Sequence, residues 1–497
     1  MDTVYYLLYV KNLTRLDKFA ILIYYTKRSI AYKDNARGSD CMKADNRTQI
    51  FETMPVRQAV LRQILPAIAS QMIALIYNLA DTYFVGMLND PKQTAAITIV
   101  YSSFVMLTAV SNLFGVGGAS MLAQALGRRE TEHAKQISSI SFWGGLLSGC
   151  LFSLLFLMLA HPILSLCGAS AETYPVAFSY AVWVVVIGGP FTILNTLLAN
   201  LVRAEGSAAH AAFGVSMGGV LNIILDPIFV LPQFFGLGVV GAGIATALAN
   251  VAATIYFLLY IQIKRRTTVV RIGLRLLRHT KEHVRGILTV GFPSALQYAL
   301  TVVAIAAQSK FVSHYTTEAV AGLGIVKKLD QLPLYFSIGV SNGMLPMLAY
   351  NHASHNYLRR QQAFRFGCLI SLGFSLLCVL CYELFAPQLA ALFIDDAVTL
   401  QYSADFLRIM VVAMPMMSLG YPMIIQFQAM GKAKEALIAS ILRRGVLDIP
   451  LLFLLDTLLP LYGCMLVQPI VDTVSLLVAA WFYRRIKQSE KNSLAHP

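Results

Sequence analysis

Twelve long apolar segments determine what this chain can fold into. Each segment is near or above the ~20 apolar residues that a helix needs to cross a bilayer. Lipid offers no partner for backbone N–H and C=O groups, so isolated segments of this length must be helices. The segments lie near residues 56–88, 94–124, 134–160, 173–201, 208–232, 240–263, 283–314, 318–350, 360–385, 398–428, 435–455 and 462–484. The sequence therefore predicts an all-α polytopic membrane protein with twelve transmembrane helices.

Composition and charge agree with this class and exclude another. Of 497 residues, 57% are hydrophobic and 13% are charged, whereas about 25% of the residues in ordinary soluble domains are charged. The net charge of +14 could suggest a nucleic-acid partner, but the Lys and Arg residues cluster in short loops between apolar segments. That pattern is typical of cytoplasmic loops of membrane proteins. We therefore expect no nucleic acid, a location in the plasma or inner membrane, and both termini in the cytoplasm.

The two halves of the chain repeat one another. Four short motifs recur at offsets of 225 to 227 residues. The matched residues are Pro66 with Pro293, Gly189-Pro190 with Met414-Pro415, Ala204-Glu205-Gly206 with Ala429-Met430-Gly431, and Gly219-Val220-Leu221-Asn222 with Gly445-Val446-Leu447-Asp448. Six spans per half is an even number, so the halves share one topology and are related by an axis along the membrane normal. Two pseudo-symmetric six-helix lobes around a central cavity are typical of an alternating-access transporter.

The repeat also divides the chain into regions. Residues 54–263 form the predicted N-lobe and residues 283–485 the predicted C-lobe. A basic cytoplasmic linker, residues 264–282, joins them, and a cytoplasmic tail, residues 486–497, follows. Residues 1–53 are polar and basic and precede the regular membrane pattern. We expect this N-terminal extension to be mobile.

The fifth span carries an amide and an acid at membrane depth. Asn222 and Asp226 are four residues apart, so a helix places them on one face. A carboxylate at bilayer depth is costly, and it normally faces a protein interior or an ion or substrate path. Pro227 follows directly and lacks a backbone N–H, so it can kink the helix beside the acid. Capping of a helix end is the alternative role for Asp226.

The first span carries a second acid. Asp81 lies near the outer end of this span, and Asn78 shares its helix face. An acid that extends to the membrane interface is the alternative role for Asp81. Pro66 lies fifteen residues earlier and can kink the helix. Burial disfavours the charged form of a carboxyl group, so Asp81 and Asp226 could hold a proton. Hard cations such as Na⁺ prefer oxygen ligands, which these side chains also supply.

Five motifs resemble those of the multidrug and toxic compound extrusion (MATE) family. They are Asn78-Leu79-Ala80-Asp81-Thr82-Tyr83-Phe84-Val85-Gly86, Gln124-Ala125-Leu126-Gly127-Arg128, Arg203-Ala204-Glu205-Gly206, Leu221-Asn222 through Asp226-Pro227, and Gly241-Ala242-Gly243-Ile244-Ala245-Thr246. The resemblance covers roughly Met54 to Arg485, and the sequence is similar to the prokaryotic DinF-type branch.

The resemblance implies a cation site in the N-lobe. In that branch the site consists of an acid in the first span, an Asn and an acid in the fifth and a Thr in the sixth, which match Asp81, Asn222, Asp226 and Thr246. It implies secondary active efflux of amphipathic, often cationic drugs or toxic compounds, coupled to H⁺ or Na⁺, by rocker-switch motion. We expect no cofactor; the coupling ion is H⁺ or Na⁺, and these four residues are the candidate Na⁺ ligands. The expected partners are small amphipathic molecules and the lipid bilayer, and the expected state is a monomer.

The C-lobe departs from other branches of the family. Those branches carry acids in the seventh and tenth spans, where this chain has glutamines: Gln297, Gln308, Gln426 and Gln428. We therefore place ion coupling in the N-lobe.

The C-lobe has charged residues of its own inside the spans. Lys327 and Asp330 are three residues apart in the eighth span, Arg444 and Asp448 are four apart in the eleventh, and Asp472 lies in the twelfth. Charges in membranes usually pair with one another. We predict a polar network in which Lys327 pairs with Asp330, so that ion pairs lock these helices together.

One other function remains as the alternative, a flippase, whereas a membrane enzyme, receptor or channel fits the sequence poorly. A lipid-linked oligosaccharide flippase of the same superfamily would need a strongly cationic cavity and often has more than twelve spans. A membrane enzyme would need a catalytic motif, but the sequence contains no HExxH metal motif and no phosphate-binding loop. We therefore predict a transporter and not an enzyme.

Overall fold

The structure is a computed structural model that describes residues 49–277 and 280–495. The chain divides into two compact units, Met1–Thr53 and Met54–Pro497. Of the first unit only a π-helical segment, Gln49–Thr53, is described, so the prediction of a mobile N-terminal extension falls almost entirely outside the described residues.

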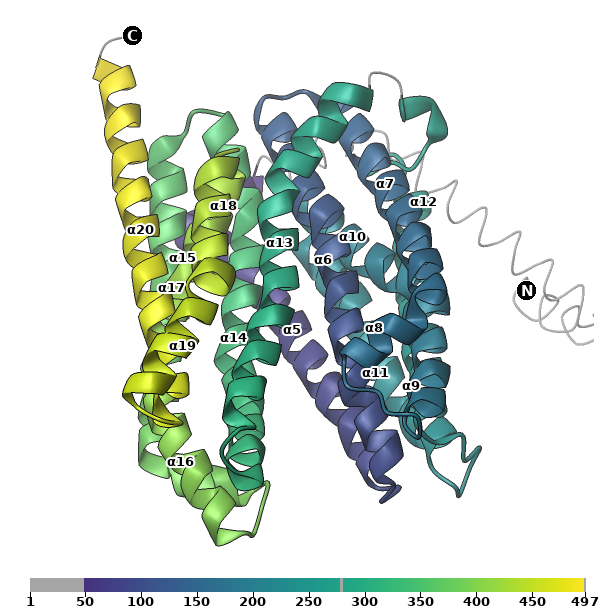
Figure 1. Cartoon of the computed structure of the whole chain (residues 1–497). Coiled ribbons are helices and arrows are strands. Elements are labelled where there is room, and N and C mark those ends of the chain that lie inside the picture. Colours follow the sequence, from purple (N-terminus) through teal and green to yellow (C-terminus); the bar gives the residue numbers. More distant parts are fainter. Residues whose placement is uncertain (1–48, 278–279, 496–497) are drawn as a thin grey trace, which may run out of the picture. The chain divides into compact units, whose positions relative to one another are not determined.

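The first half of the second unit, which we call the N-lobe, is entirely helical over its described residues (Figure 1). Its helices are α5 (Val56–Gly86), α6 (Pro91–Gly127), α7 (Thr131–Met158), α8 (Ala160–Leu166), α9 (Tyr174–Ala181), η3 (Val182–Ile187), α10 (Gly189–Ala204), α11 (Ala208–Val230) and α12 (Gly238–Ile263). Segment Tyr174–Ile187 and α10 together have the length and hydropathy of one span, bent by 44°. The short helix η4 (Leu274–Leu277) follows α12.

The second half, the C-lobe, is also helical throughout its described part. Its helices are α13 (Thr280–Val312), α14 (Thr317–Ala353), α15 (Tyr357–Ala391), α16 (Ala397–Val411), α17 (Met414–Ala429), α18 (Ala433–Ile441), η5 (Leu442–Val446), α19 (Asp448–Leu458) and α20 (Tyr462–Ala495). Helices α16 and α17 again make one span, bent by 48°.

These helices are consistent with the predicted twelve spans, with one correction to the eleventh. Nine described helices are long and apolar enough to cross a membrane, and the two bent pairs bring the number to eleven. The remaining predicted span, near 435–455, is divided among α18, η5 and α19. Arg443 and Arg444 lie in η5, and Arg444 leaves the helical region with φ −139° and ψ 29°. Two adjacent arginines thus interrupt what the hydrophobic pattern predicted as one continuous helix.

The structure confirms the internal repeat at the level of individual helices. Helices α6 and α14 each contain 37 residues and begin 226 positions apart. Helices α10 and α17 each contain 16 residues and end at matched positions. Gly206 and Gly431, which follow these two ends, both have positive φ, 94° and 70°. This backbone conformation favours glycine, so the repeated Ala-x-Gly motif is explained by helix termination.

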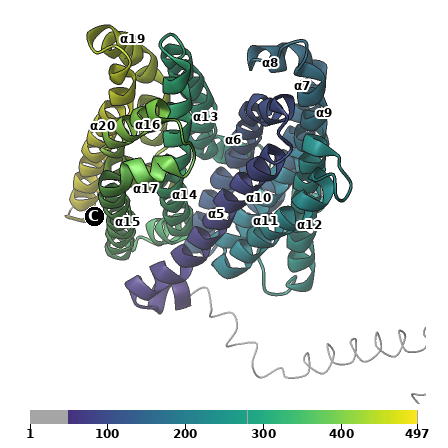
Figure 2. The ribbon, with the colours of Figure 1, turned by 90° about the horizontal axis from the view of Figure 1, so that it is seen from below.

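The two lobes meet through four long helices. Helix α6 packs along α13, and α5 packs along α14 (Figure 2). Glycines allow this close approach: a Cβ atom at Gly291 of α13 would overlap the backbone carbonyl of Leu113 in α6, and one at Gly343 of α14 would lie 2.7 Å from the Ile64 Cα in α5. These contacts are between backbones, so no side chain can move aside to relieve them.

We expect Gly291→Ala to destabilise the protein. The added methyl group must push α6 and α13 apart, and overpacking of this kind costs about 1–3 kcal/mol of unfolding free energy. Gly324→Ala in α14 is the control, because nothing lies within 4 Å of its Cβ position. The melting temperatures of both variants are measured by thermal unfolding in detergent. Equal melting temperatures would contradict the tight contact between the lobes.

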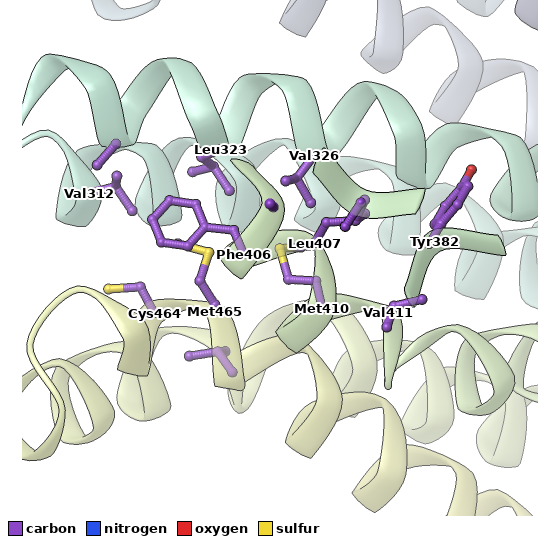
Figure 3. Close-up of a cluster of buried hydrophobic side chains, with 14 of the residues drawn as sticks. Val312, Leu323, Val326, Tyr382, Phe406, Leu407, Met410, Val411, Cys464 and Met465 are labelled. Atoms are coloured by element: carbon purple, nitrogen blue, oxygen red, sulfur yellow. The ribbon is translucent and has the colours of Figure 1, made fainter. Parts of the chain in front are cut away.

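A buried apolar cluster holds the outer part of the C-lobe together. Figure 3 shows Val312, Leu323, Phe406, Met410 and Met465 converging from α13, α14, α16 and α20. The same cluster includes Leu452 and Val467, which also line a polar cavity in the C-lobe. The charged side chains that line this cavity therefore lie directly against a close-packed apolar region.

Candidate functional site

Three N-lobe helices bring the four predicted site residues together. Asp81 comes from α5, Asn222 and Asp226 from α11, and Thr246 from α12. All four are buried, with exposed fractions of 8%, 2%, 0% and 5%. Two acids without a cation among these four residues are costly to bury unless a proton or an ion neutralises them.

Asn222 orients the site. Its Nδ2 donates hydrogen bonds to Asp226 Oδ1 at 3.2 Å and to Thr246 Oγ1 at 3.3 Å. The four-residue spacing on α11 explains the first bond, because residues four apart lie one turn from each other. Asp81 lies within electrostatic range of Asp226, close to Asn222 and Thr246. The predicted grouping of these residues is therefore what the fold produces.

Close packing of α11 against α5 sets the distance across the site. A Cβ atom at Gly219 would lie 2.8 Å from Ile73 Cγ2 and 3.1 Å from Tyr77 Cδ1. A larger residue there would move α11 away from α5 and separate Asp226 from Asp81. The glycine that begins the repeated motif thus has a role in assembling the site.

Three oxygen atoms at the site have no hydrogen-bond partner. They are Asp81 Oδ1, Asn222 Oδ1 and Asp226 Oδ2, and all are buried. Buried acceptors without partners are rare and unfavourable, by about 1–3 kcal/mol each. A proton shared between the carboxyl groups, or a hard cation bound by these oxygens, would satisfy them. The donor set fits H⁺ or Na⁺, and no group of three or more His, Cys, Asp or Glu residues that would suit a transition metal occurs in the described chain.

Two tyrosines near the site were missed by the sequence analysis. Tyr180 of α9 is 6% exposed and lies within electrostatic range of both Asp81 and Asp226. Tyr77 of α5 lies within range of Asp81, one turn away on the same helix. The only signal in the sequence was a hydroxyl group inside an apolar span, which is too common to single out a residue.

The two predicted kink residues lie within continuous helices. Pro66 is inside α5 and Pro227 is inside α11, three residues before its end. Pro227 has no N–H to donate to the carbonyl of Ile223, one turn earlier. A backbone carbonyl beside Asp226 therefore lacks its helical partner.

The C-lobe network forms, but with pairs other than those predicted. Arg443 Nε binds Asp472 Oδ1 at 2.7 Å, and both side chains are almost fully buried. Within the described residues, no ion pair closer than 4.0 Å joins Lys327 to Asp330 or Arg444 to Asp448. The prediction of a direct Lys327–Asp330 pair is therefore wrong, although the two charges still influence each other.

The error has a structural reason. The four-residue spacing predicts Arg444 on the same helical face as Asp448, but Arg444 has a non-helical backbone conformation, so this helical spacing does not hold. Arg444 Nη1 instead donates to Gln468 Oε1 at 2.7 Å, and Gln468 Nε2 donates to Asp472 Oδ2 at 2.7 Å. The network therefore runs between η5 and α20, and Arg443, which was not predicted, carries its ion pair.

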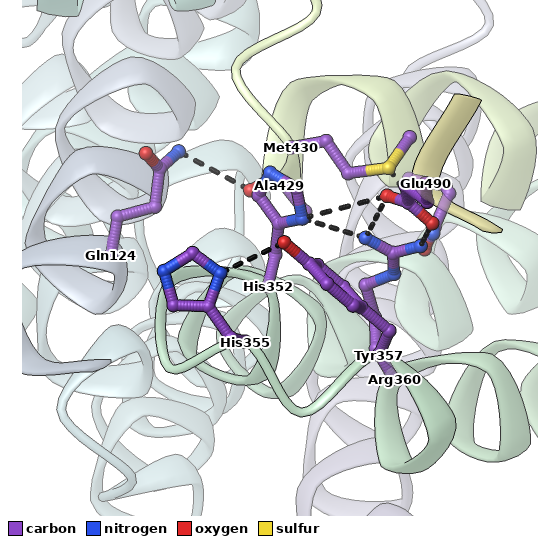
Figure 4. Close-up of polar contacts among 9 residues, drawn as sticks. Gln124, His352, His355, Tyr357, Arg360, Ala429, Met430 and Glu490 are labelled. Carbon is purple, nitrogen blue, oxygen red and sulfur yellow. Dashed lines mark hydrogen bonds and ion pairs between the residues drawn. The ribbon is translucent and has the colours of Figure 1, made fainter. Parts of the chain in front are cut away.

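Polar contacts also join the lobes at the end of the molecule that carries Gly127. Gln124 Nε2 of α6 donates to the Ala429 carbonyl of α17 at 3.2 Å (Figure 4). Ser120 Oγ donates to the Gln428 carbonyl at 2.7 Å. Nearby, within the C-lobe, Arg360 binds Glu490 at 2.6 Å. The Gln124 and Ser120 contacts join the two lobes at this end of the molecule.

Comparison with known proteins places the chain in a family. The MatE family model matches residues 66–228 and 293–454, one segment in each lobe. The multidrug export protein MepA of Staphylococcus aureus (strain MRSA252) is 30% identical over 436 residues, which cover 88% of this chain and 95% of that protein. MepA of Staphylococcus saprophyticus is also 30% identical, over 435 residues.

Solved structures agree. A multidrug resistance MATE family transporter of the MOP superfamily, in an outward-facing conformation, has a TM-score of 0.83 at 26% identity, covering 90% of this chain and 98% of that one. A MATE protein in the bent conformation has a TM-score of 0.82, again at 26% identity, covering 90% and 99%. With its two repeated lobes and these relatives, the chain belongs to the MATE family of multi-pass membrane transporters, which are not enzymes.

Proposed function

We propose that this protein is a multidrug efflux transporter that exports amphipathic cationic compounds in exchange for H⁺ or Na⁺. The relatives named for multidrug export support the efflux function. The observation that carries the coupling is the set of three buried oxygens without partners at Asp81, Asn222 and Asp226. No comparison supports the flippase alternative.

Coupling follows from competition between charge and burial. With no cation bound, the two carboxyl groups of Asp81 and Asp226 repel each other and favour separation of α5 from α11. A proton or Na⁺ removes this repulsion and favours the packed arrangement. If the drug prefers the opposite arrangement, the two ligands exclude each other, and their differential binding drives exchange.

Tyrosines from both lobes support a cationic substrate. Tyr335 of α14 lies within electrostatic range of four other tyrosines, Tyr77, Tyr101, Tyr298 and Tyr421, which come from α5, α6, α13 and α17. Aromatic faces attract organic cations. One ring already holds a cation, because the Arg443 guanidinium lies 4.0 Å from the centroid of Tyr421. A flat cationic drug would find similar faces where the lobes meet.

The charge pattern supports an orientation with both termini in the cytoplasm. Arg128 and Arg129 follow α6, and Arg265 and Arg266 follow α12, so these basic loops share one side of the membrane. On that side the Gln124 and Ser120 contacts close the interface between the lobes. We further propose that a single chain embedded in the bilayer is the transporting unit.

Transport of a fluorescent cationic dye into everted vesicles tests this function. We expect an imposed proton or sodium gradient to drive dye uptake well above that of vesicles without the protein. The gradient that drives uptake identifies the coupling ion. No dye movement under either gradient, with the protein inserted in the membrane, would refute the proposal.

A further inference from the structure

The internal repeat relates the N-lobe site to a set of residues in the C-lobe. Asp448 lies 226 positions after Asn222, and Gln308 lies 227 positions after Asp81, the offset of the repeated prolines. Gln468 lies 222 positions after Thr246. The residues matched in this way come from α19, α13 and α20, which are the counterparts of α11, α5 and α12.

A close glycine contact in each lobe supports the offset of 222 residues between Thr246 and Gln468. A Cβ atom at Gly241 of α12 would overlap the Phe229 carbonyl, and one at Gly463 of α20 would overlap the Leu455 carbonyl. Phe229 and Leu455 are 226 positions apart, whereas the two glycines are 222 apart. The two helix pairs therefore pack in the same register, with four fewer residues in the C-lobe connection.

The matched C-lobe residues lie around one cavity. Gln308, Asp448 and Gln468 are 7%, 4% and 7% exposed. All three line one small cavity, together with Lys327 and Arg444. The C-lobe thus keeps the position and part of the geometry of the N-lobe site, although only one of the three matched residues is an acid.

The two sites differ in what occupies them. Arg444 lies 226 positions after Gly218, so a guanidinium stands where the N-lobe has no side chain. Lys327 lies 226 positions after Tyr101. Among the four N-lobe site residues the unpartnered atoms are all oxygens, whereas the C-lobe cavity has one unpartnered carboxylate oxygen, Asp448 Oδ2, and one unpartnered donor, Arg444 Nε.

Charges in the C-lobe network balance without an external ion. Arg443 and Asp472 neutralise each other in their ion pair. Arg444 and Lys327 then balance Asp448 and Asp330, and Arg444 is the strongest opposite charge acting on Asp448. A positive charge of the chain is therefore present at the position where the N-lobe would bind a proton or Na⁺.

We propose that the C-lobe cavity is a second inorganic-cation site, in which the positive side chains of Arg444 and Lys327 replace the bound cation. Asp448 is its carboxylate, and Gln308 and Gln468 are its neutral oxygen ligands. The proposal rests on the proposed cation site of the N-lobe, from which it takes its geometry. It follows that removing the charge of Arg444 opens the C-lobe site to H⁺ or Na⁺.

Thermal unfolding of the purified protein in detergent tests this proposal, with NaCl compared against choline chloride at equal concentration and pH. All variants carry Asp226→Asn, which removes one of the two acids of the N-lobe site. In this background we expect Arg444→Gln to lower the melting temperature in choline chloride. Sodium then raises the melting temperature by about 2–4 °C, because a cation that binds only the folded protein stabilises it. Acidification should have the same effect.

Two further variants complete the design. Adding Asp448→Asn to Arg444→Gln restores charge balance, so we expect the melting temperature to recover and its response to sodium to disappear. Arg275→Gln removes an exposed arginine of η4 and should give no sodium response. A structural ion pair alone would predict recovery in the double variant but no rescue by sodium or acid.

Two results would overturn the proposal. The first is a sodium and acid response of Arg444→Gln that is no larger than that of the Asp226→Asn background. The second concerns the case in which Arg444→Gln cannot be purified. In that case, the proposal is wrong if the charge-balanced Arg444→Gln/Asp448→Asn variant also fails to fold. Failure of the N-lobe proposal would appear separately, as equal sodium and acid responses of the unmutated protein and Asp226→Asn.

Discussion

Vesicles containing Asp226→Asn will lose dye transport driven by an ion gradient while the protein remains folded. Asn keeps the size of the side chain and its ability to accept from Asn222, but it can neither release a proton nor neutralise a cation. Asp226 is fully buried beside Asp81, so the charge it contributes is not replaced by solvent. Coupling free energies of 1–3 kcal/mol correspond to about 5- to 150-fold changes. We expect initial uptake rates to fall by a factor in this range, measured in everted vesicles at matched protein level.

Matched variants separate coupling from general damage. Asp81→Asn should reproduce the loss, because both acids contribute an unpartnered oxygen to the site. Glu383→Gln removes an exposed acid of α15 and should leave transport unchanged. Full activity of Asp226→Asn under the same gradient would exclude the N-lobe acids as the coupling site and would direct attention to the C-lobe network.

Asp472→Asn will strongly destabilise the folded protein. The Arg443 guanidinium is 1% exposed and has Asp472 as its ion-pair partner at 2.7 Å. Its Nη1 and Nη2 atoms have no hydrogen-bond partner and lie over the ring of Tyr421. Removing one member of a buried ion pair leaves an uncompensated charge and costs about 3–5 kcal/mol. We expect a low yield of the Asp472→Asn protein from membranes and a reduced melting temperature in detergent.

The control for this effect is an exposed ion pair. Lys92 and Glu172 are 2.9 Å apart, but their side chains are 53% and 74% exposed. Exposed pairs contribute little because solvent screens them, so Glu172→Gln should leave the melting temperature unchanged. Arg443→Met combined with Asp472→Asn removes both buried charges and should recover much of the stability lost in Asp472→Asn. An unchanged melting temperature of Asp472→Asn would show that Asp472 is not needed to neutralise Arg443.

Much of the fold was predictable because transmembrane helices are recognisable in the sequence as long apolar segments. Length and hydropathy identified the spans, since only helices satisfy the backbone in lipid. The repeat was also readable, and helices of equal length, α6 with α14 and α10 with α17, confirm it. The interruption at Arg443 and Arg444 was not predictable from hydropathy, because it depends on buried partners in α20 that compensate two charges inside a span.

The sequence by itself determined the class of protein and the two-lobe repeat. It also identified Asp81 and Asp226 as candidate functional residues, because acids at membrane depth are costly. These properties depend on local quantities, namely segment length, hydropathy and the four-residue spacing of Asn222 and Asp226. Tertiary structure alone decided which groups meet. It brought Tyr180 to the acids, directed Arg444 to Gln468, and placed Asp448 in the C-lobe cavity. The physical reason is that charge compensation is a property of neighbours in space, and helices far apart in the sequence supply those neighbours.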